Sequence, residues 1–352
     1  MKVTIPAEQL QAAAAHLAAI GNYGGDHIAI TTGTDRLVLS TAGDCLAVRT
    51  GAPATVNDPG TVLVPAPAFL NTVGHLVGTV EVTDETDNVS ISDRAGTTAL
   101  TAVVGAVAPV IPDVTATTST TFSPGSLARM VRPIRPAIEK STNQPGLGGI
   151  CFDAGNNRLR LVATDARRLA VVSTDLPALD TTPLVPPKVL LNALKALDPS
   201  KDVTATADRL HIRFTDGTTE VTLGLIQAPF PAWENLVKIT ENASVTVPAH
   251  ELRSSVARVA VVLQSHEPVV LTGSPSHGLA ISAAAADTGS AQVAVTGASV
   301  TGTELRFGMN HRFLLEALGH TDGDVTLTYQ APDKGVRCQV GDTMWFLMPI
   351  RV

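Results

Sequence analysis

The sequence predicts an α+β protein in which one unit occurs three times, each unit being built from two β-α-β-β-β modules. Residues 3–10 (VTIPAEQL) return almost unchanged as residues 245–252 (VTVPAHEL), and a fainter copy occupies residues 121–127 (TFSPGSL). Such self-similarity at a long, fixed period indicates repeated structural units. Each copy is an alternating strand followed by proline, whose fixed φ suits the start of a helix. The repeats predict domains at residues 1–118, 119–242 and 243–352.

The first domain shows the predicted order of elements. A helix is expected over residues 7–20, because Leu10, Ala13, Ala14 and Leu17 fall on one helical face. A second helix is expected over residues 66–76. The expected strands cover residues 2–5, 27–31, 36–40, 46–50, 80–84, 89–92 and 97–104, with another that ends at residue 65.

A half-repeat within each domain raises the number of modules to six. Residues 64–71 (VPAPAFLN) align without gaps on residues 185–192 (VPPKVLLN), and residues 310–315 (NHRFLL) take the same place in the third domain. The helix expected over residues 125–140 contains Pro133 and Pro136, so we expect it to be kinked or split near Arg132. If the sheets of six modules join edge to edge, with all helices on one face, the product is a ring with helices inside and sheets outside.

The composition is that of a packed globular protein. Of 352 residues, 44% are apolar and 16% are charged. The three cysteines, Cys45, Cys151 and Cys338, are far apart and have no paired spacing, so we expect reduced thiols in a cytoplasmic protein. No apolar run approaches the ~18 residues of a membrane span, and no signal-peptide pattern precedes the first strand.

The charge is unevenly distributed along the chain. The net charge is −7, and residues 1–118 hold 4 Lys+Arg against 11 Asp+Glu. This balance argues against a protein that coats nucleic acid nonspecifically. The expected helices of the second and third domains nevertheless carry mainly cations, which suit duplex DNA held through its phosphates. On charge alone, an ordinary solvated helix face explains these cations equally well. They are Arg129, Arg132, Arg135, Lys140, Lys188, Lys195, Arg253, Arg258 and Arg312.

Four segments resemble one known family. Residues 161–171 (LVATDARRLAV) resemble the signature of the bacterial beta sliding clamp, the processivity subunit of DNA polymerase III. Residues 230–233 (FPAW), 310–315 (NHRFLL) and 348–352 (MPIRV) are similar to further motifs of that family, in the same order. The resemblance implies a non-catalytic homodimer that closes head to tail around duplex DNA. It also implies a clamp-loader ATPase that opens the ring, and polymerases and repair factors that dock short peptides between the second and third domains.

The same resemblance assigns residues to the peptide pocket. An apolar floor would seat the peptide's small anchors, and Arg168 would orient it. Arg168 could instead form an interdomain salt bridge, and the tail could be a buried last strand. The assigned residues are Leu147, Thr164, Arg167, Arg168, Leu169, Pro231, Leu236, Asn310, Phe313, Met348, Pro349, Ile350, Arg351 and Val352.

Three departures from the family pattern leave an alternative open. Ala166 replaces a glycine of the signature, Trp233 replaces a tyrosine, and the two helices expected in the first domain contain no Lys or Arg. The alternative is an accessory or mobile-element paralogue that binds clamp partners or inhibitors with little DNA binding. We expect no enzyme, cofactor or metal site, because no GxxxxGK[ST], HExxH or GxSxG motif occurs. The strand that seals a ring is expected near residues 103–110 or 277–281.

Overall fold

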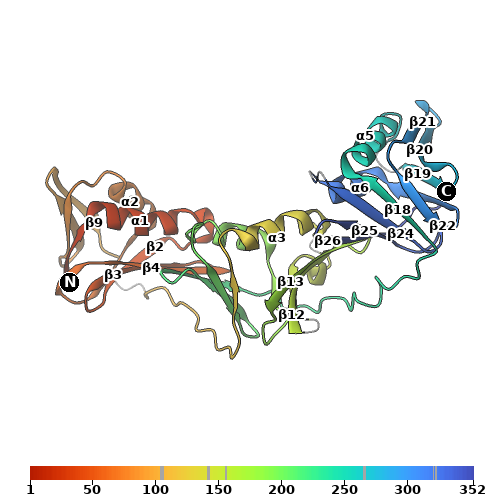
Figure 1. Ribbon diagram of the computed structural model, residues 1–352. Helices are drawn as coiled ribbons and strands as arrows, with labels where there is room; N and C mark the ends of the chain where they lie inside the picture. Colours follow the sequence, from red (N-terminus) through yellow and green to blue (C-terminus); the bar gives the residue numbers. More distant parts are fainter. Residues whose placement is uncertain (104–106, 141–142, 155–156, 265–266, 320, 322) are drawn as a thin grey trace. The chain divides into compact units, whose positions relative to one another are not determined.

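The computed structural model describes residues 1–352 except 104–106, 141–142, 155–156, 265–266, 320 and 322 (Figure 1). Its internal contacts divide the chain into two units. Unit 1 comprises Met1–Ala128, Ala154–Asn157 and Leu176–Gln227, and unit 2 comprises Arg129–Asp153, Arg158–Asp175 and Ala228–Val352. Helices and strands occur in both units, which confirms the predicted α+β class. The division into three domains stays a prediction.

The predicted module recurs six times in the order of elements. Residues 1–118 contain two modules, with one additional strand, β5, between them. The elements are β1 (Lys2–Pro6), α1 (Ala7–Ala18), β2 (His27–Thr32), β3 (Arg36–Ala42), β4 (Leu46–Pro53), β5 (Thr55–Asp58), β6 (Thr61–Pro65), α2 (Ala66–Val73), β7 (Thr79–Asp84), β8 (Asn88–Asp93) and β9 (Gly96–Thr101). The strand expected over residues 97–104 thus ends at Thr101, and its last expected residue lies outside the described part of the chain.

Residues 119–242 repeat the order, and their described part contains no additional strand. Their elements are β10 (Thr120–Phe122), α3 (Ser126–Ile134), β11 (Ile150–Asp153), β12 (Arg158–Thr164), β13 (Arg168–Pro177), β14 (Leu184–Val185), α4 (Pro187–Ala193), β15 (Val203–Ala207), β16 (His211–Thr215) and β17 (Thr219–Gly224).

Residues 243–352 again include one additional strand, β22. Their elements are β18 (Ala243–Pro248), α5 (Ala249–Ala260), β19 (Pro268–Ser274), β20 (Gly278–Ala285), β21 (Gly289–Val295), β22 (Ser299–Gly302), β23 (Leu305–Asn310), α6 (His311–Leu318), β24 (Asp324–Tyr329), β25 (Val336–Val340) and β26 (Thr343–Leu347).

Proline marks the passage from strand to helix, as the repeats predict. Pro6, Pro65, Pro186 and Pro248 occupy the N-cap positions of α1, α2, α4 and α5, each with φ between −58° and −63°. At α6 the N-cap is Asn310, whose side-chain oxygen accepts a hydrogen bond from the Arg312 N–H. A strand that ends in proline therefore positions the first turn of the following helix.

Helix α3 confirms the expectation of a split. The α-helical hydrogen bonds stop at Ile134, one residue after Pro133, and a 3₁₀ turn covers Arg135–Ala137. Proline has no N–H to donate and its ring clashes with the preceding turn, so two prolines three residues apart end the α-helix. Another 3₁₀ turn, Pro145–Leu147, precedes β11.

Unit 1 contains two antiparallel sheets covered by helices. One sheet has the order β5-β1-β7-β8-β9, and the other has the order β10-β15-β16-β17-β4-β3-β2-β6. Helices α1 and α2 pack against each other, and α1 lies against β3 and β4 (Figure 1). Leu10, Leu17 and Phe69 are at most 3% exposed in this core. The pairing of β17 with β4 joins residues 219–223 to residues 46–50 in one continuous sheet.

Unit 2 has the same construction. One sheet has the order β21-β20-β19-β23, and a larger one runs β11-β12-β13-β26-β25-β24-β18-β22 within this unit. Helix α5 lies against β20 and β21, and α6 lies against β23, β25 and β26 (Figure 1). The pairing of β13 with β26 joins residues 168–172 to residues 343–347. Sheets therefore join edge to edge at β4–β17 and at β13–β26, as six adjacent modules require.

Neither segment expected to form a ring-sealing edge is an edge strand in the described chain. Residues 278–281 belong to β20, which pairs with both β19 and β21 and is therefore interior, so this expectation is wrong. The Val103 N–H donates to the carbonyl of Leu63 in β6, residues 104–106 lie outside the described residues, and residues 107–110 form no strand. The sheet ends nearest to these segments are β9 and β21. A strand's place in a sheet depends on pairings that alternation along the sequence cannot show.

Candidate functional site

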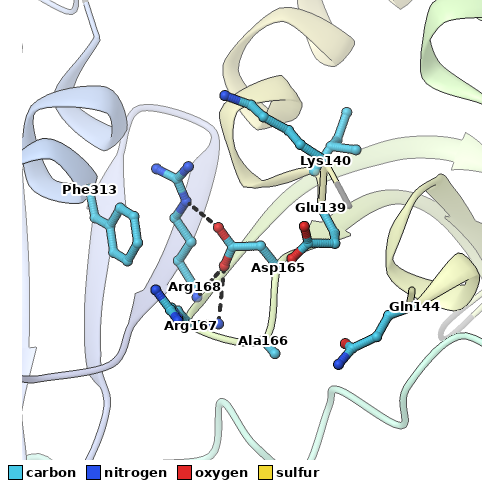
Figure 2. A pocket seen from close by; sticks show the side chains of 9 residues that line it. Glu139, Lys140, Gln144, Asp165, Ala166, Arg167, Arg168 and Phe313 are labelled. Atoms are coloured by element: carbon cyan, nitrogen blue, oxygen red, sulfur yellow. Dashed lines mark hydrogen bonds and ion pairs between the residues drawn. The ribbon is translucent and has the colours of Figure 1, made fainter. Parts of the chain in front are cut away.

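The site is built on the turn that joins β12 to β13, where the sequence reads TDARR. Thr164 Oγ1 donates to the Arg168 carbonyl and accepts from the Ala166 N–H, and Asp165 Oδ1 accepts from the N–H groups of Arg167 and Arg168, at 3.0 Å each. Ala166 has φ 67°, in the left-handed region that favours glycine. Short polar side chains thus hold a tight turn that presents Arg167 to solvent and directs Arg168 inward (Figure 2).

Arg168 connects this turn to helix α6. Its side chain is only 6% exposed, and its Nε donates to Asp165 Oδ2 at 3.0 Å. The guanidinium also pairs with Glu316 and donates to the Pro136 carbonyl. It lies 4.2 Å from the centre of the Phe313 ring (Figure 2). A buried cation requires such partners, because an unpaired buried charge is costly. Arg168 therefore forms the salt bridge between the predicted second and third domains that the sequence left open.

A pocket of about 500 Å³ opens beside this arginine. Apolar side chains of Ile138 and Phe313 and charged side chains of both signs surround it. Arg167, Arg168 and Phe313 are the three residues of the predicted peptide pocket that line it, and Lys140, predicted to contact DNA, lines it as well. The remaining lining residues are Glu139, Gln144, Asp165 and Ala166 (Figure 2).

The C-terminal tail lies against the same turn. The Met348 N–H donates to the Arg167 carbonyl at 3.0 Å, and the Ile350 N–H donates to the Gly308 carbonyl at 2.9 Å, just before α6 begins. Met348 is 43% exposed and Val352 is 59% exposed, so the tail continues beyond β26 without being a buried strand. The structure thus brings Met348 to the turn and Ile350 to the start of α6, near Asn310.

The other predicted pocket residues occupy the surrounding walls. Thr164, Leu169 and Leu147 are buried at 8% exposure or less. Pro231 and Leu236 are exposed on the segment that follows β17. Pro349 is half-buried and Arg351 is exposed. None of these residues lines the pocket described above.

Trp233 fixes the segment that carries Pro231 and Leu236. The indole is 6% exposed, and the Arg160 guanidinium lies 4.6 Å from its ring centre. Arg160 also pairs with Asp153 and, at 2.6 Å, with Glu234. Cation–π and ion-pair contacts therefore hold this segment against β11 and β12. Sequence reasoning missed Arg160, although its position between apolar residues of a strand is a signal of a partnered charge.

The predicted DNA-contacting cations lie on or just beyond helices α3, α4, α5 and α6. Arg129, Arg132, Lys188, Arg258 and Arg312 are exposed on the helices themselves. Arg135, Lys140 and Lys195 are exposed beyond the ends of α3 and α4. Arg253 differs, because it is half-buried and its Nη2 donates to the Thr321 carbonyl at 2.8 Å.

The described residues hold neither a cluster of metal ligands nor a membrane-spanning helix. No group of three His, Cys, Asp or Glu side chains among them is placed to hold a metal ion. No helix within the described ranges is long and apolar enough to cross a membrane. Burial raises the pKa of the Cys151 and Cys338 thiols to about 12, so both stay protonated at neutral pH.

Comparisons with known proteins agree on one family. Residues 121–232 match the family model described as "DNA polymerase III beta subunit, central domain". A beta sliding clamp of Synechococcus elongatus is 27% identical over 314 residues, which cover 85% of this chain and 84% of the relative. Solved structures of the Pseudomonas aeruginosa DNA polymerase III subunit beta and of a Bacillus subtilis DNA polymerase sliding clamp have the same fold. Their TM-scores are 0.86 and 0.85 at 20% and 18% identity. The first comparison covers 100% of both chains, and the second covers 100% of this chain and 99% of the other.

The structural matches establish the fold, and the sequence matches connect it to one family. Arg168 of the signature turn contacts Phe313 of α6, and the Met348 N–H bonds to the same turn. The chain is thus similar in sequence over most of its length to bacterial beta sliding clamps and shares the fold of solved DNA polymerase III beta subunits, and residues 121–232 match the central domain of that family.

Proposed function

We propose that this protein is a DNA sliding clamp: two chains close head to tail around duplex DNA and tether a polymerase for processive synthesis. The observation that carries the proposal is the sequence similarity to a beta sliding clamp over 85% of the chain. The proposed role is topological and needs no catalysis. It places the protein in the cytoplasm, with a clamp-loader ATPase to open the ring.

Weak, sequence-blind contacts to DNA follow from the exposed helix cations. Arg132 on α3, Lys188 on α4 and Arg258 on α5 are exposed on the helices themselves. Long cationic side chains of this kind exchange contacts between phosphates and water, which permits sliding. Helices α1 and α2 offer only His16 as a basic group, so the contribution of the first domain to DNA binding is small in this proposal.

Ring closure is proposed to use the two open sheet ends, β9 in unit 1 and β21 in unit 2. Each strand pairs on one side only within the described chain, with β8 and β20 respectively. The unpaired backbone groups of an edge strand form a template for another strand. Pairing of β9 with β21 of a second chain, repeated once by symmetry, makes a closed head-to-tail homodimer.

Partners are proposed to dock short peptides around Arg168, Phe313 and Met348. Phe313 offers an aromatic face beside the pocket, and Met348 is an exposed apolar side chain at the turn. Replacing Phe313 or Met348 by alanine should weaken the binding of a peptide from a polymerase tail by about 1 to 3 kcal/mol, because apolar anchors carry most of the binding free energy. Calorimetry on the intact dimer checks this, with the exposed Val261→Ala on α5's C-cap as the control. Unchanged peptide affinity in both variants contradicts the pocket assignment.

Retention on plasmid DNA tests the clamp function itself. The protein, a matched clamp loader and ATP are incubated with nicked circular plasmid, and half of the sample is then linearised before gel filtration. Retention on the circle and loss from the linear form is the expected result, because a ring slides off a free end. Failure to remain on either form, with normal peptide binding, would favour a paralogue that binds clamp partners without encircling DNA.

A further inference from the structure

A second pocket, of about 250 Å³, lies in unit 1, and the proposed function makes no use of it. It is formed by strands β3 and β4 and by the turn before β17, so it spans the β4–β17 pairing that joins two modules into one sheet. Its polar lining includes Arg36, Arg49, Thr218 and Glu220. Pockets with converging polar groups are candidate binding sites.

The pocket faces away from helix α1. Side chains alternate between the two faces of a strand, and Leu37 and Leu39 of β3 are buried at 1% exposure or less on the side covered by α1 (Figure 1). Arg36 and Val38 therefore lie on the opposite side. The proposed DNA contacts are on the helices, so this pocket is available to a ligand of another kind.

Arg36 is held over the backbone of β4. A Cβ placed on Gly51 would lie 2.6 Å from Arg36 Nη2 and 3.0 Å from Nε, so the absence of a side chain at Gly51 lets the guanidinium rest on the strand. Within the described part of the chain, the Arg36 side chain makes no hydrogen bond or ion pair, although its backbone carbonyl accepts from the Gly33 N–H. Its planar set of donors is thus positioned without a protein acceptor.

Arg49 and Thr218 supply further donors. Arg49 Nη2 lies 3.1 Å from Glu220 Oε2, but Arg49 Nε is buried and has no hydrogen-bond partner among the described residues. Thr218 Oγ1 accepts from Lys201 Nζ at 3.0 Å, which leaves its own O–H free to donate. A buried N–H without an acceptor costs free energy, and a bound acceptor would remove that cost.

The charges define the ligand. Among the lining side chains, two guanidinium groups and one carboxylate leave one positive charge, which a single negative charge balances. Lys201, which contacts Thr218, is paired with Asp198 at 3.9 Å and adds no net charge. We propose that this pocket binds one carboxylate group, held by the Arg36 fork and by the donors of Arg49 and Thr218. A planar carboxylate matches the guanidinium fork in bidentate geometry. Glu220 repels a dianionic phosphate more strongly than a carboxylate. The carboxylate comes either from an acidic side chain of a partner protein or from a small free acid.

Saturation-transfer NMR on the full-length protein at low salt tests the proposal with three probes. N-acetyl-aspartate N-methylamide represents an acidic side chain, acetate represents a free acid, and methyl phosphate represents a phosphate. We expect Arg36→Gln to weaken carboxylate binding about tenfold, because it removes a charged hydrogen-bond donor. Glu220→Gln should strengthen binding, because it removes the competing carboxylate. Arg94→Gln, an exposed cation at the β8–β9 turn, should leave binding unchanged.

The outcomes separate the sources and can overturn the proposal. Binding of the aspartate probe alone identifies a partner's side chain, and equal binding of acetate identifies a free acid. The proposal would be overturned if methyl phosphate bound more tightly than either carboxylate. It would also be overturned if the wild-type protein and Arg36→Gln bound the carboxylate probes with equal affinity. Absence of all binding to the wild-type protein would overturn it too. These measurements need no DNA or clamp loader, so they stand apart from the test of clamp function.

Discussion

At the scale of single residues, the backbone at Ala166 is under strain. Its φ of 67° lies in the left-handed region, which costs an alanine about 1 kcal/mol or more relative to glycine. The turn keeps this conformation because Thr164 and Asp165 bond its N–H groups. The resemblance showed a glycine at this position in the family, and the structure gives the physical reason for that glycine.

Replacement of Ala166 by glycine should therefore raise the free energy of unfolding by about 1 kcal/mol. Urea denaturation measures the change as a shift of midpoint at constant slope. Gly341→Ala, in the β25–β26 turn of the same unit, is the matched control. Its φ is +55° and a Cβ there would meet only open space, so the variant should be destabilised by a similar amount. A neutral or destabilising Ala166→Gly would show that the left-handed turn is not strained.

Asp180 fixes the segment that leads into β10, and its effect depends on pH. Its carboxylate accepts from the N–H groups of Thr117 and Thr118 and from the Thr117 hydroxyl. These hydrogen bonds lower the pKa of Asp180 from 3.8 to about 2. A lowered carboxyl pKa means that the unfolded chain binds the proton more tightly. The stabilisation is therefore complete above about pH 4 and is lost as pH falls towards 2.

The expected result for Asp180→Ala is a lower unfolding midpoint than wild type at pH 6, and a smaller difference at pH 3. Urea denaturation at both pH values measures it. Asp175→Ala serves as the control, because its ion pair with Arg158 is exposed and the variant should change the midpoint little at either pH. A constant difference between Asp180→Ala and wild type across this range would exclude the proposed linkage.

The chemistry of the site could be predicted from sequence only in part. The TDARR signature located the turn. The two possible roles of Arg168, orienting a peptide and forming an interdomain salt bridge, were both identified. The positions of Ile138 and Gln144 could not be predicted, because they follow the end of α3 and depend on how the chain folds back against the turn. Leu147 and Thr164 were assigned to the peptide pocket, yet both are buried and neither lines the pocket beside Arg168, since a motif does not tell how exposed each of its side chains is.

At the scale of elements, the aligned repeats, together with proline and helical spacing in some copies, predicted the six α-helices of the described chain, because each of these signals lies within a short stretch of sequence. The end of α3 followed from the proline's missing N–H. Strands β5 and β22 were missed, because four-residue edge strands with mostly exposed side chains have no apolar alternation. The interior position of β20 also escaped prediction, since the pairing with β21 is set by the sheet and not by the strand's own residues.

The β4–β17 pairing depends on a buried pair of hydroxyls. Thr50 and Thr219 lie opposite each other, are at most 1% exposed, and their Oγ1 atoms are 2.9 Å apart. Replacing either one by valine leaves the other hydroxyl buried without this partner, at a cost of about 1 to 3 kcal/mol. Replacing both removes the unsatisfied group, so the double variant should be close to wild type.

A double-mutant cycle in urea measures this coupling. The expected cost of the double variant is well below the sum of the costs of Thr50→Val and Thr219→Val. The exposed hydroxyl pair Ser92–Thr97, at 2.9 Å, gives the control cycle, where water replaces a lost partner and the coupling should be near zero. Additive costs at Thr50 and Thr219 would mean that the hydroxyl pair does not hold the two modules together.

At the scale of the whole molecule, the repeated module explains how an acidic protein can act on DNA. Strands pair across module boundaries at β4–β17 and β13–β26, so the sheets continue while the helices stay on one face within each unit. The net charge of −7 is concentrated in residues 1–118. Several exposed cations lie on α3, α4, α5 and α6. In the proposed clamp, charge separated in this way would keep DNA contacts few and weak, as sliding requires.

The salt dependence of DNA binding should report those few contacts. The variant Arg132→Gln with Lys188→Gln removes two exposed helix cations. It should reduce the slope of log K against log salt on linear duplex by about 2, because each phosphate contact contributes ~0.9. Fluorescence anisotropy between about 50 and 200 mM salt measures the slope, and Arg94→Gln should leave it unchanged. Retention on closed circular plasmid should depend much less on salt in wild type and in both variants, since a closed ring cannot leave by losing phosphate contacts. A slope that Arg94→Gln changes as much as the double variant does would show that the helices are not the DNA-facing surface.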